Sequence, residues 1–291
     1  MATTLAAWVH GARVRTLPAA IAPVLIGTGA AAWAGAASVP RALLATGVAL
    51  ALQIGVNFSN DYSDGVRGTD DQRVGPMRLT ATGAVRPATV KRAAFASFAV
   101  AAVLGLVLCA LAGAWWLIGV GAVAVLAAWY YTGGSSPYGY AGLGEVAVLV
   151  FFGLVATLGT TYTQAGAINA PAVLGAFAVG LLSCAILMVN NIRDIGTDAP
   201  AGKRTLAVRL GQVWARRAYA AMMALGVLSG VTVALWEPWA LLVTVLAGPA
   251  VALSRRVVRG AQTGALILTL RDSGFVVLGM GLLLGGVLTL A

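Results

Sequence analysis

Residues 57–71 read NFSNDYSDGVRGTDD, and this polar stretch directly follows a long apolar run. It holds four of the nine acidic residues of the 291-residue chain within eleven positions. A second polar stretch, NNIRDIGTD at residues 190–198, also follows an apolar run and is succeeded by Gly202–Thr205, which reads GKRT. We expect the chemistry of the protein to lie at these two places.

Composition points to a membrane protein. Hydrophobic residues make up 60% of the chain, charged residues make up 10%, and the mean hydropathy is +0.90. This amount of polar surface is too small to coat a soluble globule. We therefore expect a lipid bilayer as partner. The net charge of +10 does not indicate nucleic acid, because long apolar runs separate the cations. Cys109 and Cys184 lie inside apolar runs, so we expect no disulfide framework or zinc site.

Charge-free intervals predict an all-α polytopic bundle of nine transmembrane helices, forming a single domain over residues 1–291. A membrane helix needs about 20 apolar residues. Five intervals of 17 to 25 uncharged residues hold one helix each, and residues 93–144 and 146–192 hold two each. We place the turns of those longer intervals at Gly133–Pro137 and Gly166–Pro171.

The basic residues predict the orientation. With a cytoplasmic N-terminus, 18 of the 19 Lys and Arg residues fall on the cytoplasmic side and only Arg41 falls outside. Both acidic stretches then face the cytoplasm.

Each polar stretch places oxygen-bearing side chains at helical spacing. If the helices continue through the stretches, three residues of each project from one face. The sets are Asn57, Asp61 and Asp64 in the first stretch, and Asn190, Asp194 and Asp198 in the second. The alternative is that these acids cap helices or neutralise loop arginines.

Such ligands favour Mg²⁺ or Mn²⁺, because carboxylate and amide oxygens suit hard cations and no His or Cys is nearby. Mg²⁺ often completes its coordination shell with phosphate oxygens. Cations beside the stretches are candidates for contacts to those phosphates: Arg67, Arg78, Arg193, Lys203 and Arg204. The pattern therefore predicts a diphosphate site at the membrane surface.

At these residues the chain resembles the UbiA superfamily of intramembrane aromatic prenyltransferases, whose two Asp-rich motifs lie on the second and sixth of nine helices. Four segments look like the branch that prenylates 1,4-dihydroxy-2-naphthoate in menaquinone synthesis: RTLP at 15–18, NFSNDYSD at 57–64, GYAGLGE at 139–145, and residues 190–207. The wider superfamily has an Asp four residues after Asp64. Here that place is Gly68 and the acid is Asp70, as is typical of the naphthoate branch.

The resemblance implies transfer of a polyprenyl group from a polyprenyl diphosphate to 1,4-dihydroxy-2-naphthoate, a small aromatic acid, with loss of CO₂ and diphosphate to give demethylmenaquinol. It implies a bacterial plasma-membrane enzyme whose active site opens near the cytoplasmic face. Mg²⁺, or alternatively Mn²⁺, is expected on Asn57, Asp61, Asp64, Asp194 and Asp198, of which the four aspartates are the catalytic residues. Whether Asp70 or Asp71 also contacts metal stays open.

Substrate contacts are expected from Asn57, Asn60, Arg67, Arg78, Asn190, Arg193, Lys203, Tyr131 and Tyr138. Five tyrosines near the cytoplasmic boundary are candidates for stabilising an allylic cation through their π faces, or for an interfacial belt. They are Tyr62, Tyr130, Tyr131, Tyr138 and Tyr140.

Two alternatives remain. In the first, the acceptor is another ring, such as 4-hydroxybenzoate or homogentisate, because the Asp motifs select the diphosphate and not the aromatic compound. A cation-coupled transporter is the rival from another class, although its ionisable residues would be expected deep in the spans.

Overall fold

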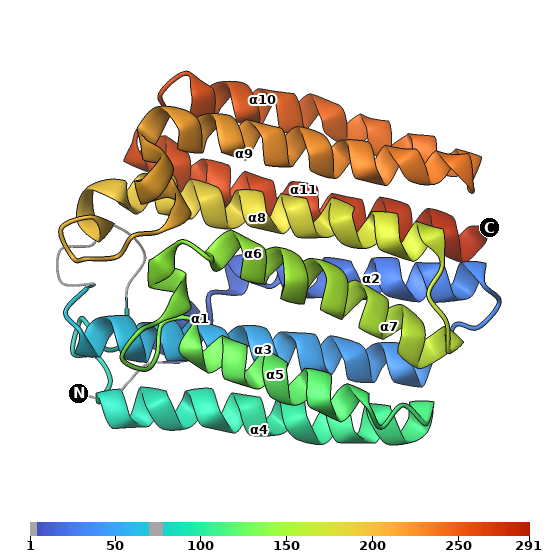
Figure 1. The fold of residues 1–291 in the computed structure, drawn as a ribbon, viewed down its shortest axis with the longest axis horizontal. Coiled ribbons are helices and arrows are strands. Elements are labelled where there is room, and N and C mark those ends of the chain that lie inside the picture. The colour runs from blue at the N-terminus through green and yellow to red at the C-terminus, as the bar shows by residue number, and fades with distance from the viewer. Residues whose placement is uncertain (1–4, 70–77) are drawn as a thin grey trace.

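The computed structural model describes residues 5–69 and 78–291, and every regular element within these ranges is helical. The long helices run side by side along one axis and form an elongated bundle (Figure 1). The expected all-α class is therefore confirmed for the described residues.

The helices are bounded as follows: α1 Leu5–Ala12, α2 Pro18–Trp33, α3 Val39–Val66, α4 Pro87–Ala112, α5 Leu117–Tyr130, α6 Gly144–Val148, α7 Ala156–Ala165, α8 Ala170–Asp198, α9 Leu206–Thr232, α10 Ala247–Val258 and α11 Thr263–Leu290. Short segments join them: η1 Val14–Thr16, η2 Tyr138–Ala141, η3 Leu149–Val155, η4 Val233–Leu235 and η5 Pro238–Leu246. Of these, η3 is a π-helical stretch that joins α6 to α7 in one continuous helix.

Seven helices of the described chain are long and apolar enough to cross a membrane. They are α3, α4, the α6–η3–α7 helix, α8, α9 with η4, η5 with α10, and α11. The sequence predicts nine, and the two remaining intervals contain the shorter apolar helices α2 and α5, with 16 and 14 residues. The protein is thus a multi-pass membrane protein.

One of the two expected turns is misplaced. The turn at Gly166–Pro171 is found, since α7 ends at Ala165 and Gly166 has a φ of 70°. Gly133–Pro137 instead follows α5, and α4 is separated from α5 by a short turn that begins at Gly113, with a φ of 65°. A single glycine in the left-handed region is enough to end a helix, so the richer Gly-Ser-Pro cluster was the wrong choice.

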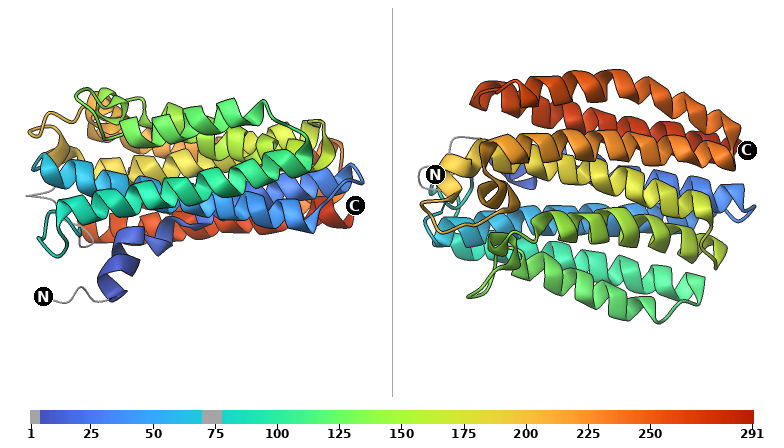
Figure 2. Two further views of the ribbon diagram at one scale, coloured as in Figure 1. Left: turned by 90° about the horizontal axis from the view of Figure 1, so that it is seen from below. Right: turned by 45° about the horizontal axis from the view of Figure 1, so that its top comes forward.

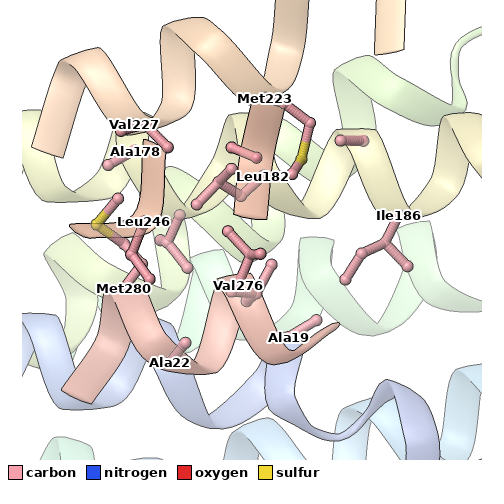
Figure 3. Close-up of a cluster of buried hydrophobic side chains, with 14 of the residues drawn as sticks. Ala19, Ala22, Ala178, Leu182, Ile186, Met223, Val227, Leu246, Val276 and Met280 are labelled. Carbon is pink, nitrogen blue, oxygen red and sulfur yellow. The ribbon is translucent and has the colours of Figure 1, made fainter. Parts of the chain in front are cut away.

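The main core lies between α2, α8, α9 and α11 (Figure 3). Ala178 and Leu182 of α8 lie beside Val227 and Met223 of α9 there. Elsewhere small residues let helix backbones approach: a methyl group added to Gly281 of α11 would lie 2.7 Å from the Cα of Ala22. Such close approach is how membrane helices gain packing energy without a hydrophobic driving force.

The bundle brings the two polar stretches to one end. Helix α3 continues through Asp64 and α8 continues through Asp198, as the sequence predicted. The carboxyl ends of α3, α5 and α8 lie at the same end of the bundle in all three views (Figures 1 and 2). The residues expected to act together are therefore close in space.

Arg41 lies at the other end of the bundle. Its guanidinium donates to the carbonyl oxygens of Leu111, Thr163 and Gln164, at distances of 2.6, 3.1 and 3.3 Å. These carbonyls belong to the last turns of α4 and α7, where helix dipoles favour a cation. Arg41 thus joins two helix ends.

We expect Arg41→Met to lower the free energy of unfolding by about 1–2 kcal/mol, because carbonyls lose a charged donor. Arg41→Lys should lose less, since its ammonium can still reach one carbonyl. Arg255→Met, at an exposed arginine of α10, is the matched control. Unfolding of the purified protein measures the effect, and equal losses for Arg41→Met and Arg255→Met would contradict the proposed role.

Candidate active site

The two polar stretches meet at Lys203. Its Nζ lies 3.8 Å from Oδ2 of Asp64, at the end of α3, and 3.7 Å from Oδ1 of Asp198, at the end of α8. Both aspartates are buried, with exposed fractions of 2% and 6%. Two carboxylates from helices far apart in sequence therefore share one cation.

Asp64 has further partners besides Lys203. Its Oδ1 accepts a hydrogen bond of 2.9 Å from the hydroxyl of Tyr140, and Arg78 Nη2 lies 4.0 Å from its Oδ2. Burial, followed by the negative charge of Asp64, raises the pKa of Tyr140 above its ordinary value of 10. The phenol therefore stays protonated and keeps donating at neutral pH.

Tyr140 also organises the surrounding loops. Its ring lies beneath Lys203, 5.3 Å from Nζ, and beneath the guanidinium of Arg67, at 5.4 Å. The backbone carbonyl of Tyr140 accepts from the N–H of Arg204, which ties η2 to the loop after α8. This contact fixes the loop that carries Lys203.

Asp61 points to a different partner from Asp64. Its two carboxylate oxygens accept hydrogen bonds of 2.8 Å from the backbone N–H groups of Leu79 and Thr80, and its side chain is fully buried. The carboxylate therefore holds the turn that follows Arg78. By its spacing Asp61 shares one broad face of α3 with Asn57 and Asp64, and on that face its carboxylate is turned to the backbone N–H groups of Leu79 and Thr80.

A cavity of about 370 Å³ begins at this site and continues between the helices. Its polar end includes Asn60, Asp64, Arg78, Asn190 and Lys203. The rest is mainly apolar, with Val24, Leu52, Leu108, Val120 and Phe151 in its walls. Its volume lies in the range of ligand pockets.

The two asparagines of the first stretch both line the cavity. Asn57 Nδ2 donates to the carbonyl of Ala12 at 2.9 Å, and so ties α3 to the end of α1. Asn60 Oδ1 accepts a 2.8 Å hydrogen bond from the hydroxyl of Thr132. Asn60 stands next to Asp64 on the cavity wall, whereas Asn57 supports the amino-terminal segment.

In the second stretch, Arg193 binds residues of its own helix. Its Nε and Nη2 each lie 2.7 Å from an oxygen of Asp194, and Nη2 also donates to Asn190 Oδ1 at 2.9 Å. Arg193 and Asp194 are both buried, with side-chain exposures of 3% and 6%. This bidentate pair sets the direction of the Asn190 amide, and Asn190 lines the cavity.

Carboxylate and amide oxygens are the groups available for a cation. Among the described residues, no three His, Cys, Asp or Glu side chains are grouped as a ready-made cage. Asp64 and Asp198 nevertheless hold one positive charge between them, in Lys203. This donor set fits Mg²⁺, which usually takes only one or two protein carboxylates and completes its shell with water and substrate phosphate.

The profile of the UbiA prenyltransferase family matches residues 20–270. The chain belongs to the UbiA prenyltransferase family. This membership confirms the expected resemblance and the expectation of a prenyltransferase over a transporter.

Similar proteins extend the comparison. The 1,4-dihydroxy-2-naphthoate octaprenyltransferase of Mycobacterium tuberculosis is 53% identical, over 98% of this chain and 97% of its own length. The protein of the same name from Escherichia coli is 42% identical, over 75% of this chain and 72% of its own. A UbiA homologue from Archaeoglobus fulgidus, solved with GPP and Mg²⁺, shares the fold at a TM-score of 0.66 and 14% identity, over 98% of this chain and 99% of that one.

Arg67 does not face the cavity of this UbiA protein. Its guanidinium donates to the carbonyl oxygens of Thr132 and Gly134, in the loop after α5. These contacts hold the loop, and the expected contact of Arg67 with phosphate stays a prediction. Asp70 and Asp71, whose role at a metal was left open, lie outside the described residues.

The five candidate tyrosines separate into distinct groups. Tyr131 and Tyr138 line the cavity, with ring centroids 5.5 Å apart. Burial raises the pKa of Tyr138 to about 12, and its hydroxyl donates to the carbonyl of Ala127. Tyr140 binds Asp64, Tyr62 stacks on Trp129 away from the cavity lining, and Tyr130 is half exposed.

Sequence reasoning gave no role to several cavity residues. Arg13 and Thr16 line the cavity, and Asn191 does so beside the expected Asn190. Glu145 lies behind Asn191, where Asn191 Nδ2 donates to its Oε1 at 3.3 Å. The sequence marked Glu145 only as the last residue of the GYAGLGE segment at 139–145 and gave it no role, because an acid at the start of an apolar run equally fits a helix cap.

Proposed function

We propose that the protein transfers a polyprenyl group from a polyprenyl diphosphate to 1,4-dihydroxy-2-naphthoate in a Mg²⁺-dependent reaction, releasing CO₂ and diphosphate and giving demethylmenaquinol. The observation that carries this proposal is the meeting of Asp64 and Asp198 on Lys203 at the polar end of a largely apolar cavity. The 53% identity to a protein named for this acceptor, over nearly the whole of both chains, supports the choice of aromatic ring.

The diphosphate lies at the polar end of the cavity in this proposal. Lys203 and Arg78 supply positive charge there, and Asn190 supplies an amide. Arg193 acts through Asn190 and Asp194, which it holds in place. Asp64, Asp194 and Asp198, together with Asn60, would hold Mg²⁺, while Asn57 and Asp61 position the chain around it.

Mg²⁺ bound there supplies positive charge that stabilises the leaving diphosphate. The allylic C–O bond breaks and diphosphate leaves with the bonding electrons, while Lys203 and Arg78 stabilise the added charge. The ring carbon that bears the carboxylate then forms the new C–C bond with an electron pair of the ring. The carboxyl group leaves as CO₂, and its bonding pair stays in the ring.

The prenyl tail lies in the apolar part of the cavity. Residues of α5 on the cavity wall recur at helical spacing: Leu117, Val120, Gly121, Ala124 and Ala128. The opposite wall comes from the π-helical stretch, through Phe151 and Phe152. These walls keep water from the allylic cation, which would otherwise be hydrolysed.

In the membrane we propose nine spans, with α2 and α5 completing the set, a cytoplasmic N-terminus and a site that opens near the cytoplasmic face of a bacterial plasma membrane. The charge distribution supports this, since 18 of the 19 basic residues then lie inside. Arg41, the exception, lies at the bundle end opposite Asp64 (Figure 1).

The test is a transfer assay with the purified protein in lipid nanodiscs, labelled polyprenyl diphosphate and Mg²⁺. Three acceptors are compared at equal concentration: 1,4-dihydroxy-2-naphthoate, 4-hydroxybenzoate and homogentisate. We expect a labelled lipid product with the naphthoate only, and none after removal of Mg²⁺ by EDTA. Transfer to another ring would change the assigned acceptor, and no product from any ring would reject the proposed reaction.

A further inference from the structure

The proposed reaction leaves one buried acid without a role. Glu145, in the first turn of α6, is 5% exposed and does not line the cavity. Its Oε1 accepts a hydrogen bond of 3.3 Å from Nδ2 of Asn191, on α8. Because a buried carboxylate is unfavourable without donors, the contact with Asn191 matters for both residues.

This contact fixes the polarity of the Asn191 amide. An amide donates through nitrogen and accepts through oxygen, so an Nδ2 turned to Glu145 leaves Oδ1 for the other side. Asn191 lines the cavity, and no donor to Oδ1 occurs in the described part of the chain. A hydrogen-bond acceptor is thus presented to the cavity.

The neighbouring amide has the opposite polarity. Asn190 Oδ1 accepts from Arg193, which leaves the Asn190 NH₂ group for the cavity that this residue also lines. A donor such as Asn190 suits a phosphate oxygen, as do Lys203 and Arg78. The Asn191 carbonyl repels phosphate oxygens, so it requires a ligand that donates a hydrogen bond.

We propose that Asn191, oriented by Glu145, accepts a hydrogen bond from a ring hydroxyl of the aromatic acceptor. This inference rests on the proposed function for the identity of the ring. The prenyl tail carries no donor, whereas the dihydroxynaphthoate carries two hydroxyls. The hydroxyl at position 1 bonds to the neighbouring carboxylate within the molecule, so the hydroxyl at position 4 is the one that meets Asn191.

The surroundings suit an aromatic ring. Tyr131 and Tyr138 line the same cavity with their ring centroids 5.5 Å apart, and Ser183 of α8 lies on the wall about two turns before Asn191. Tyr131 packs directly on the segment before Glu145, because a methyl group at Gly144 would lie 3.2 Å from its hydroxyl.

The hydrogen bond would serve both selection and reaction. A site built to pair with a substrate hydroxyl discriminates strongly against an analogue that lacks it, because a polar group is left unpaired. Accepting a hydrogen bond from the hydroxyl also pushes electron density into the ring, which makes its carbon a better nucleophile. Asn191 is the residue that touches substrate, and Glu145 is a positioning residue.

The experiment measures binding without turnover. The intrinsic fluorescence of naphthoates reports binding to the protein in nanodiscs, kept anaerobic and free of prenyl donor. The probes are 1,4-dihydroxy-2-naphthoate and 1-hydroxy-2-naphthoate, which lacks the hydroxyl at position 4. We expect the wild-type protein to prefer the first by about tenfold, the value of one hydrogen bond in a buried site.

Matched variants locate the source of the preference. Asn191→Ala should abolish it, and Glu145→Leu should reduce it. Glu145→Gln should retain it, because its amide oxygen still accepts from Asn191. Asn190→Ala should keep the preference while raising the KM for prenyl diphosphate.

Equal binding of the two probes by the wild-type protein would overturn the inference, whatever the variants do. A preference that survives Asn191→Ala in folded protein would also overturn it. If the Asn191-dependent preference is present but the transfer assay gives no product, the ring site stands and the proposed reaction fails. If product forms without that preference, the proposed reaction stands and the assignment of Asn191 fails.

Discussion

Asp64→Ala and Asp198→Ala should each lower kcat by about 10²- to 10³-fold, the loss typical of removing one group that stabilises charge in a transition state. Each carboxylate lies within 4 Å of the same Lys203 ammonium, so each contributes to the charge balance of the diphosphate site. Losing either carboxylate weakens the binding of Mg²⁺ and leaves Lys203 with a single carboxylate. The Mg²⁺ concentration needed for half-maximal activity should therefore rise in both variants.

Prenyl transfer as a function of Mg²⁺ concentration measures this effect, with thermal unfolding as a check on folding. Asp272→Ala is the matched control. Asp272 of α11 pairs with Arg256 of α10 and with Arg271 of α11, and it does not line the cavity at Asp64. Wild-type turnover in a folded Asp64→Ala protein would remove that residue from the site.

Asp61→Ala should destabilise the protein by about 3–5 kcal/mol, because two backbone N–H groups lose a charged acceptor at a fully buried position. The turn after Arg78 is held by these bonds, so Arg78 should lose its position beside Asp64 and activity should fall as well. Asp61→Asn keeps one acceptor oxygen and should lose less stability. The Mg²⁺ requirement of whatever activity remains should match that of the wild type.

The comparison of Asp61 with Asp64 separates two roles for neighbouring acids of one motif. Unfolding temperatures and Mg²⁺ titrations of both alanine variants provide the data. A stable Asp61→Ala protein with a raised Mg²⁺ requirement would instead make Asp61 a metal ligand, as its helical spacing with Asn57 first suggested.

The shared face inferred from the sequence depended on helical continuation through Asp64 and Asp198, and the structure shows this continuation. The sequence also indicated that the two stretches act together, and Lys203 joins them in the structure. Arg78, Asn60 and Asn190 likewise reach the polar end of the cavity as expected.

Other residues could not be placed from the sequence, because their direction depends on partners that fold back from a distance. Asp61 turns to amides 18 and 19 residues further along the chain, and Arg67 turns to carbonyls 65 and 67 residues away. Periodicity assigns a residue to a broad face of its helix and does not say which loop covers that face. For the same reason, a role for Glu145 follows only from its hydrogen bond with Asn191 in the structure.

A structure with Mn²⁺ in place of Mg²⁺ and a non-reacting thio analogue of the prenyl diphosphate tests the central claim most directly, because anomalous scattering locates the metal. We predict the metal between α3 and α8, in contact with Asp64 and Asp198, and the diphosphate against Lys203 and Arg78. A metal bound through Asp61, or a diphosphate bound away from these two helix ends, would contradict the account.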